Sequence, residues 1–577
     1  MKTAALFTVT ALWGITSTFA QDWPSWGGSD PGRNMYSPAK GMQVAFGKRD
    51  EKGTYSIPFK PNSEEVDLTG TENIKWAVKL GSQTYGNPVV ASGKVLVGTN
   101  NASPRDPRFK DDKSVLLCFD EYTGEFLWQF TVPKLASGKV NDWEFLGILS
   151  SPFVEGDRVY LVTSRCEVVC LDLNGQSNGN QGPFQDEGKY MPGPNKPPVE
   201  VTAKDADILW RYDMMDELGV FPHNASNSSP IVWEDKVYVC TSNGQDWTHV
   251  NIPSPLSPSF ICLDAKSGEL LGEDDAQIGN NIKHGQWTSP SIGVVNEKAH
   301  VYFGGGDGVL YALDVNPTKE GDANYIKKVW WFDAVPEEYK KDKAGKPIKY
   351  PAAEGPSEIN STPVFYKNRV YVAIGQDPEH GEGVGRIVCV DATKTGDITK
   401  TGLIWDYRKI KRSISTVSID PETGLLFIAD YSGFVYCLDA ETGKENWVHD
   451  MQAHMWGSTF LADGKVYVGD EDGDVLVFAA AKEKKLLAEI NASAAVYSTA
   501  IVANGALFIG SQTHLFAVAA GGKDAAEPAA PAAAEPPPEA AAEPKAATET
   551  KPAAEAKPAP KEKPASAKKK PATKQRK

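Results

Sequence analysis

Short apolar runs alternate with polar turns along most of the chain. Between residues 73 and 520, apolar residues recur at every second position within each run, and the breaks carry Gly, Asp and Asn. A period of two with such breaks is typical of β-strands joined by hairpins. The pattern therefore predicts an all-β protein.

One longer pattern recurs along this region. It consists of Ser, Thr or Asn, often followed by Pro, then two apolar residues, a short turn and a second apolar strand, as in "NSTPVFYKNRVYVAI" from Asn360. The copies begin at Tyr85, Leu149, Asn227, Trp287, Asn360, Ile414, Trp456 and Tyr497. A complete copy supplies four short strands, and stacked units of this kind are typical of β-propellers. The repeats predict an eight-bladed β-propeller of four-stranded antiparallel blades over residues 73–520.

The ends of the repeat region predict how the ring closes. The last copy stops at residues 515–520 without a fourth strand, while "NIKWAVKL" at residues 73–80 precedes the first copy as a strand without a unit. An open final blade would leave strand edges exposed. We therefore expect the N-terminal strand at 73–80 to complete the last blade.

A second phrase follows the third strand of several units. It reads "CLDAETGKENW" from Cys437, with looser copies from Cys118 and Cys262. We expect its Asp and Gly to form a turn and its Trp to lie on the outer strand, wedged between blades, where a buried Trp stabilises by about 3 kcal/mol or more relative to Ala. The expected docking residues are Trp76, Trp128, Trp210, Trp331, Trp405 and Trp447.

The two ends of the chain differ from the repeats. Residues 1–20 carry Lys2, an apolar run and small residues, which predicts a cleaved secretory signal and a periplasmic or secreted protein. Residues 21–72 precede the repeats and are expected to form an N-terminal entry segment. No further run is apolar enough to predict an integral membrane span, and we expect a monomeric propeller.

The C-terminal segment 521–577 is rich in Ala, Pro, Glu and Lys and has no aromatic residue, which predicts disorder. It has twelve Lys/Arg and eight Asp/Glu, whereas the whole chain carries a net charge of −15, so the body is acidic. The tail is interpreted either as a spacer or as a contact for a polyanion. The acidic body argues against a dedicated nucleic-acid-binding domain.

The cysteines favour a structural role. Five of the seven stand two residues before an Asp in equivalent units, where they resemble small apolar core residues. No C-x-x-C spacing occurs, so cysteine ligation of a metal is not predicted.

The repeated phrase resembles the tryptophan-docking motif of the pyrroloquinoline quinone (PQQ) repeat propellers. Asp439, Thr442, Gly443, Lys444 and Trp447 match that motif, with Cys437 in place of its Ala. The resemblance implies one of two functions. Some members are quinoprotein dehydrogenases that hold PQQ and Ca²⁺ in the central funnel and oxidise alcohols or sugars. Others, such as the outer-membrane β-barrel assembly lipoprotein, bind no quinone and act as scaffolds.

Two motifs that are missing from the sequence help to choose between these functions. The resemblance implies that a member of the alcohol-oxidising branch would have a vicinal Cys-Cys disulfide at the quinone. This sequence has neither a Cys-Cys pair nor a C-x-x-C-H haem motif. These absences favour a noncatalytic binding or scaffold protein of the cell envelope, without a cofactor and with a protein or envelope partner. A PQQ-dependent oxidoreductase with PQQ and Ca²⁺ remains the alternative, and the sequence identifies no catalytic residue.

Candidate ligand-binding residues lie in the loops that enter the inner strands, because these loops rim one mouth of a propeller channel. They are His223, Asn224, His284, Gln286, Trp287, Asn360, Arg412, His454 and Trp456. Together such side chains could stack on and hydrogen-bond a planar acidic ligand, or they could simply fill and hydrate the channel. The acidic stretch "DEDGD" at 470–474 lacks the Glu that a Ca²⁺ loop needs at its twelfth position, so we expect a hairpin turn without a metal.

Overall fold

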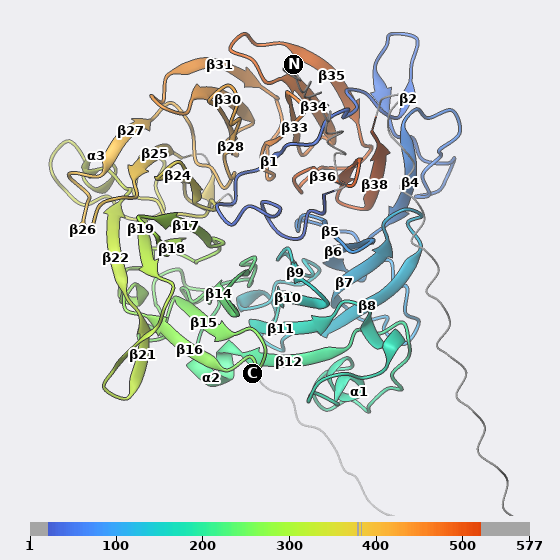
Figure 1. The fold of residues 1–577 in the computed structure, drawn as a ribbon, viewed down its shortest axis with the longest axis horizontal. Helices are drawn as coiled ribbons and strands as arrows, with labels where there is room; N and C mark the ends of the chain where they lie inside the picture. Colours follow the sequence, from blue (N-terminus) through green and yellow to red (C-terminus); the bar gives the residue numbers. More distant parts are fainter. Residues whose placement is uncertain (1–20, 378–379, 382, 521–577) are drawn as a thin grey trace, which may run out of the picture. The chain divides into compact units, whose positions relative to one another are not determined.

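The computed structural model describes residues 21–377, 380–381 and 383–520, and their regular structure is almost entirely β. Sheets follow one another around a common centre, with the first strand of each unit nearest that centre (Figure 1). The predicted signal peptide and C-terminal tail lie outside the described residues. Among the described helices, none has the length and hydropathy that crossing a membrane requires.

In the described part of the chain, seven blades each take four antiparallel strands from one stretch of sequence. The first three are β5 (Val89–Ala91), β6 (Lys94–Asn100), β7 (Lys113–Asp120), β8 (Phe126–Pro133); β9 (Phe153–Glu155), β10 (Arg158–Val162), β11 (Glu167–Asp172), β12 (Ile208–Asp213); and β13 (Ile231–Trp233), β14 (Lys236–Cys240), β15 (Phe260–Asp264), β16 (Leu270–Asp274). The next two are β17 (Ser291–Val295), β18 (Lys298–Gly304), β19 (Val309–Asp314), β22 (Lys328–Asp333); and β23 (Val364–Tyr366), β24 (Arg369–Ile374), β25 (Arg386–Asp391), β27 (Leu403–Tyr407). The last two are β28 (Ser418–Ile419), β29 (Leu425–Ala429), β30 (Phe434–Asp439), β31 (Glu445–Asp450); and β32 (Phe460–Ala462), β33 (Lys465–Gly469), β34 (Asp474–Ala479), β35 (Leu486–Asn491).

The remaining sheet is composite. It joins β36 (Ile501–Ala503), β37 (Ala506–Gly510) and β38 (His514–Ala519) to β4 (Ile74–Lys79) from the other end of the propeller sequence. Strand β4 runs antiparallel to β38, as the closure argument predicts. The two ends of the repeat region are thereby locked together.

The prediction of an eight-bladed propeller of four-stranded antiparallel blades is wrong, because the described residues form seven blades of this kind. Seven blades are contiguous, the composite sheet differs from them, and three sheets carry additional strands. The additions are β1 (Tyr36–Ser37), β2 (Lys48–Arg49), β3 (Tyr55–Ser56), β20 (Thr318–Glu320), β21 (Ala323–Ile326) and β26 (Gly396–Asp397). Four of these contacts are parallel pairs, which a repeat of antiparallel hairpins cannot predict because they join distant segments.

Short helices occupy the longer connections. They are the 3₁₀ helices η1 (Gly138–Val140), η2 (Gly175–Asn178) and η3 (Gly279–Asn281), and the α-helices α1 (Glu187–Tyr190), α2 (Met214–Leu218) and α3 (Glu337–Lys340). The stretch "DEDGD" forms the turn between β33 and β34, where the Asp474 N–H donates to Asp470 Oδ1 at 2.9 Å.

The repeated phrase builds a turn that receives a Trp from the neighbouring blade. In the blade β28–β31, Asp439 Oδ1 accepts hydrogen bonds from the Thr442 N–H and hydroxyl at 3.0 and 2.9 Å. Gly443 follows with φ +70°, and a Cβ there would lie 2.5 Å from the Trp405 ring. Glycine is therefore required both by the left-handed backbone and by the indole.

The same docking recurs around the ring. Indole Nε1 atoms donate to carbonyls of the next blade in the pairs Trp76–Glu121, Trp128–Leu173, Trp210–Ala265, Trp330–Ala392, Trp405–Ala440 and Trp447–Ala481, at 2.9–3.3 Å. The prediction of Trp331 at this position is wrong, because Trp330 is the fully buried residue and Trp331 lies partly exposed beside Lys328. The inserted hairpin β20–β21 separates the Asp phrase from its Trp, so residue counting cannot distinguish the two.

Residues 21–37, which we call the N-terminal bridge, run along the inner strands (Figure 1). The bridge exchanges backbone hydrogen bonds with residues at Val90, Val154, Ile292, Phe365, Leu461 and Asn504. Arg33 is fully buried and donates to Pro230 O at 2.7 Å and Pro290 O at 3.1 Å, while Asn34 pairs with the backbone of Ile419. One segment therefore ties together the innermost strands of successive sheets.

Candidate functional site

The loops that enter the inner strands are joined by hydrogen bonds between units. In six units, the second residue before the inner strand donates its backbone N–H to the side chain at the equivalent place in the next unit, at 2.7–3.0 Å. The donor–acceptor pairs are Asn87–Ser151, Ser151–Ser229, Ser229–Ser289, Thr416–Ser458, Ser458–Thr499 and Thr499–Asn87. The Ser, Thr or Asn of the repeat thus holds the loops of the candidate site in fixed positions.

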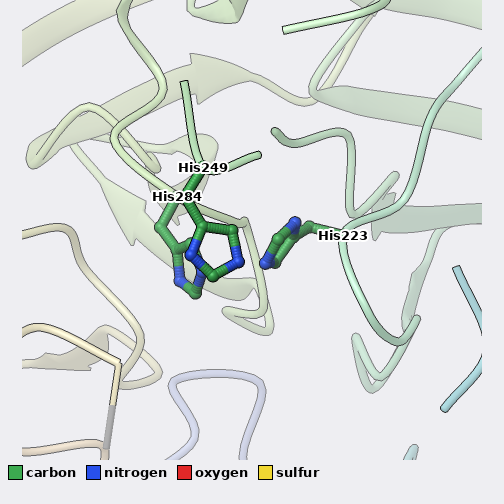
Figure 2. Close-up of side chains that lie close together, drawn as sticks. All are labelled: His223, His249 and His284. Atoms are coloured by element: carbon green, nitrogen blue, oxygen red, sulfur yellow. The ribbon is translucent and has the colours of Figure 1, made fainter. Parts of the chain in front are cut away.

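Two of the predicted residues, His223 and His284, lie at the centre of a histidine cluster. Their ring centroids are 4.2 Å apart, and both side chains are buried. His249, from the loop between β14 and β15, places its ring 5.1 Å from His223 and 4.9 Å from His284 (Figure 2). His380 adds a fourth ring, with its Nε2 3.4 Å from Nε2 of His284.

Burial sets the charge state of three of the histidines, His223, His284 and His380. It lowers the pKa of His223 to about 4, and burial together with the neighbouring imidazoles lowers the pKa of His284 to about 2. Burial also lowers the pKa of His380. These three rings are consequently neutral at physiological pH, which is the form that accepts a hydrogen bond or binds a metal.

An acidic group adjoins the histidines. Glu358 is fully buried, and its Oε1 accepts hydrogen bonds from the Tyr350 hydroxyl at 3.0 Å and the Asp377 N–H at 3.1 Å. Burial and the nearby Asp377 carboxylate raise the pKa of Glu358 to about 8. Asp377 Oδ2 also lies 3.9 Å from Nδ1 of His284, so the acidic group and the histidine cluster are in contact.

The other predicted residues form an aromatic cluster beyond Asp377. Arg412 donates to the Asp377 carbonyl at 2.9 Å, and its guanidinium lies 4.9 Å from the Tyr431 ring centroid. His454 stacks on Tyr431 at 4.5 Å, and Trp456 meets the same ring edge-on at 5.2 Å. A continuous series of contacts therefore runs from the histidines through Asp377 and Arg412 to Trp456.

Four predicted residues lie around the histidine and acidic groups. Trp287 Nε1 donates to the carbonyls of His223 and Ala225 at 3.3 and 3.2 Å. Gln286 donates to Asn243 O and Ser259 Oγ, and Asn360 Nδ2 donates to Glu358 Oε1 at 3.3 Å. Asn224 exchanges backbone hydrogen bonds with Val140 and Trp143 instead of contacting the rings.

Sequence reasoning missed His249, His380, Asp377 and Glu358. None belongs to the repeated inner-strand entry pattern, and His249 lies in the long loop between β14 and β15. The small number of histidines was the available signal. Because the chain has only 8, those in long loops near the predicted mouth could have been included among the candidate ligand-binding residues.

The comparisons with known proteins agree with this architecture. A family model described as outer membrane protein assembly factor BamB matches residues 66–335 and 385–523. The quinohemoprotein alcohol dehydrogenase ADH-IIG of Pseudomonas putida is 25% identical over 296 residues, covering 45% of this chain. The match covers only 38% of that relative's own length.

A solved structure shows the same fold at low sequence identity. The quinohemoprotein alcohol dehydrogenase ADHIIG of Pseudomonas putida HK5 has a TM-score of 0.51 and 12% identity, covering 90% of this chain and 82% of the other. BamB from Moraxella catarrhalis has a TM-score of 0.49 and 15% identity, covering 77% of this chain and 99% of the other. Because the family model matches more than half of the sequence, the chain belongs to the PQQ-repeat β-propeller family described as outer membrane protein assembly factor BamB.

Proposed function

We propose that this chain is an exported, noncatalytic binding protein of the cell envelope whose propeller carries a protein partner. One observation carries the proposal: large apolar side chains are exposed on loops, and one of them, Trp247, lies beside His249 of the candidate site. Phe145, Trp247, Val250 and Leu256, which we call the apolar rim, have exposed fractions of 59%, 51%, 76% and 92%. Exposed aromatic and aliphatic side chains of this kind are what protein interfaces bury.

Trp247 of the apolar rim is held by contacts with neighbouring loops. Lys139 Nζ lies 3.6 Å from the Trp143 ring centroid and 5.0 Å from that of Trp247, which joins two loops. Trp247 in turn lies 6.1 Å from the ring of His249. Such anchoring reduces the entropy that a partner must overcome on binding.

The description of the family supports the idea that a protein partner binds the apolar rim. Its description names an outer membrane protein assembly factor, and such a factor would act on other proteins. The predicted signal at 1–20 would deliver the chain to the periplasm or outside the cell, and the tail 521–577 would act as a spacer or a polyanion contact.

Photo-crosslinking in the envelope of the producing organism tests the proposal. A crosslinking amino acid at position 256 of the full chain is expected to give a discrete adduct, and Trp247→Ala with Val250→Ser should abolish it. The matched control is position 404, an Ile on the outer strand β27 with 41% exposure. Identical adducts from positions 256 and 404, or an adduct unaffected by the rim substitutions, would contradict the proposal.

A PQQ-dependent oxidoreductase is the second candidate function. Glu358 Oε2 and Asn360 Oδ1 are buried without a hydrogen-bond donor among the described residues. Oxygen atoms of this kind suit Ca²⁺, and the matched relative in Pseudomonas putida is a quinohemoprotein alcohol dehydrogenase.

The residues fit the quinone itself less well than they fit a cation. Arg412 touches the acidic group through the Asp377 carbonyl, and its guanidinium also lies over the Tyr431 ring. The Trp287 ring is covered by Gly285, where a Cβ would lie 2.5 Å from the indole, and by the two buried histidines. We therefore favour the noncatalytic function.

A further inference from the structure

Four of the 8 histidines in the chain lie together, although they come from separate loops. One ring nitrogen each of His223, His249 and His284 lies within 4.8 Å of the other two. Figure 2 shows the rings of His249 and His284 side by side, with the ring of His223 directed toward them. Three imidazoles on different loops that converge in this way match the donors of a transition-metal site.

The hydrogen bonds of His223 orient its ring for ligation. Its Nδ1 lies 2.7 Å from the Gln245 carbonyl oxygen, so Nδ1 carries the proton and Nε2 carries the lone pair. Nε2 is buried and has no hydrogen-bond partner among the described residues. Metal-binding histidines are usually held in this manner, by a carbonyl or carboxylate on the other ring nitrogen.

His284 has a comparable unused atom. Its Nδ1 is buried without a hydrogen-bond partner in the described part of the chain, and Asp377 Oδ2 lies 3.9 Å away. Leaving two buried ring nitrogens without partners is costly, roughly 1–3 kcal/mol for each polar group. A cation bound by the converging rings would give the Nε2 lone pair of His223 a partner, which ring packing does not supply.

The backbone holds the buried rings together. Gln245 N–H donates to the His284 carbonyl at 2.9 Å, and the Gln245 carbonyl is the acceptor for His223. Gly244 permits this approach, since a Cβ there would lie 2.7 Å from His223 Cβ and 2.9 Å from the His284 carbonyl oxygen. His249 is exposed and gives the cluster access from solvent.

We propose that His223, His249 and His284 bind one divalent transition-metal ion of the Zn²⁺ type. Nitrogen ligands favour Zn²⁺ and its neighbours over Ca²⁺, which prefers oxygen. The site goes beyond the proposed function, because metal binding requires neither a protein partner nor a quinone.

The test is titration of the purified, chelator-treated full chain with Co²⁺ and Zn²⁺. We expect one Co²⁺ per chain with visible absorption bands of nitrogen coordination, displacement of Co²⁺ by Zn²⁺ but not by Ca²⁺, and a higher Tm with Zn²⁺. His249→Ala is the informative variant, because this residue is exposed and its loss should spare folding. It should weaken Zn²⁺ binding at least about 10-fold, since even outer-shell substitutions have effects of this size.

His449→Ala is the matched control, because His449 lies on β31 outside the cluster. It should bind Zn²⁺ as the unmodified chain does. The proposal is overturned if the unmodified chain binds no Co²⁺ or Zn²⁺, or if His249→Ala binds Zn²⁺ with unchanged affinity. Neither result bears on crosslinking from the apolar rim, so the two proposals fail separately.

Discussion

Trp405 and Gly443 form the contact that joins two consecutive blades. The indole Nε1 donates to the Ala440 carbonyl at 3.0 Å, and the ring occupies the space that a Cβ on Gly443 would need. The blade-to-blade contact therefore depends as much on the absent side chain of Gly443 as on the indole.

Gly443→Ala is expected to destabilise the protein more than an equivalent substitution elsewhere. The left-handed backbone costs about 1–2 kcal/mol for a residue with a Cβ, and the clash with the indole adds roughly 1–3 kcal/mol. Gly424→Ala is the control, because Gly424 also has φ +70° but a Cβ there would meet no atom of the described residues within 4 Å. Urea unfolding should show the larger loss for Gly443→Ala, and equal losses would refute the steric explanation.

Adjacent tryptophans on β22 should behave differently. Trp330→Ala removes a buried indole and its hydrogen bond to Ala392, which should reduce the free energy of unfolding by about 3–5 kcal/mol. Trp331→Ala removes a partly exposed ring and should cost well under half of that. Denaturant midpoints of the two variants measure the difference, and a greater loss for Trp331→Ala would contradict the assignment.

His514 should contribute to the acid sensitivity of the fold. Burial lowers its pKa to about 4, despite an opposing contribution from the Glu64 backbone, with Lys79 and Arg105 also nearby. The unfolded chain therefore binds this proton near pH 6.5, before the folded protein does, so folding stability falls as the pH drops from about 6.5 to 4.

The contribution of this one group is at most about 1.4 kcal/mol per pH unit. His514→Gln should flatten the pH dependence of the free energy of unfolding in this window, as measured by urea unfolding at several pH values. An unchanged slope would show that another group is responsible.

Local sequence pattern predicts much of the fold because the inner and middle strands repeat it faithfully. The orphan strand at 73–80 predicts closure because an unpaired edge is unfavourable, and β4 pairs with β38. The added strands could not be predicted, since β1 and β3 pair with strands more than 400 residues away in sequence. Trp330 was missed because the inserted hairpin β20–β21 changes the number of residues between the Asp of the repeated phrase and the docking Trp.

The site was predictable only where it coincides with the repeat. His223, His284 and Trp287 precede inner strands, so the propeller geometry places them at the channel. His249 and Glu358 depend on loops whose paths are set by tertiary contacts, such as the bridge between Glu358 and Gly375. No periodic signal reports where such a loop folds back.

Addition of PQQ and Ca²⁺ to the purified chain tests the central claim of a noncatalytic binding protein most directly. Quinone absorbance after gel filtration measures binding, and dye reduction with alcohols or sugars measures turnover. We predict neither stoichiometric quinone nor substrate-dependent dye reduction. Stoichiometric PQQ together with turnover would contradict the account and establish the oxidoreductase alternative.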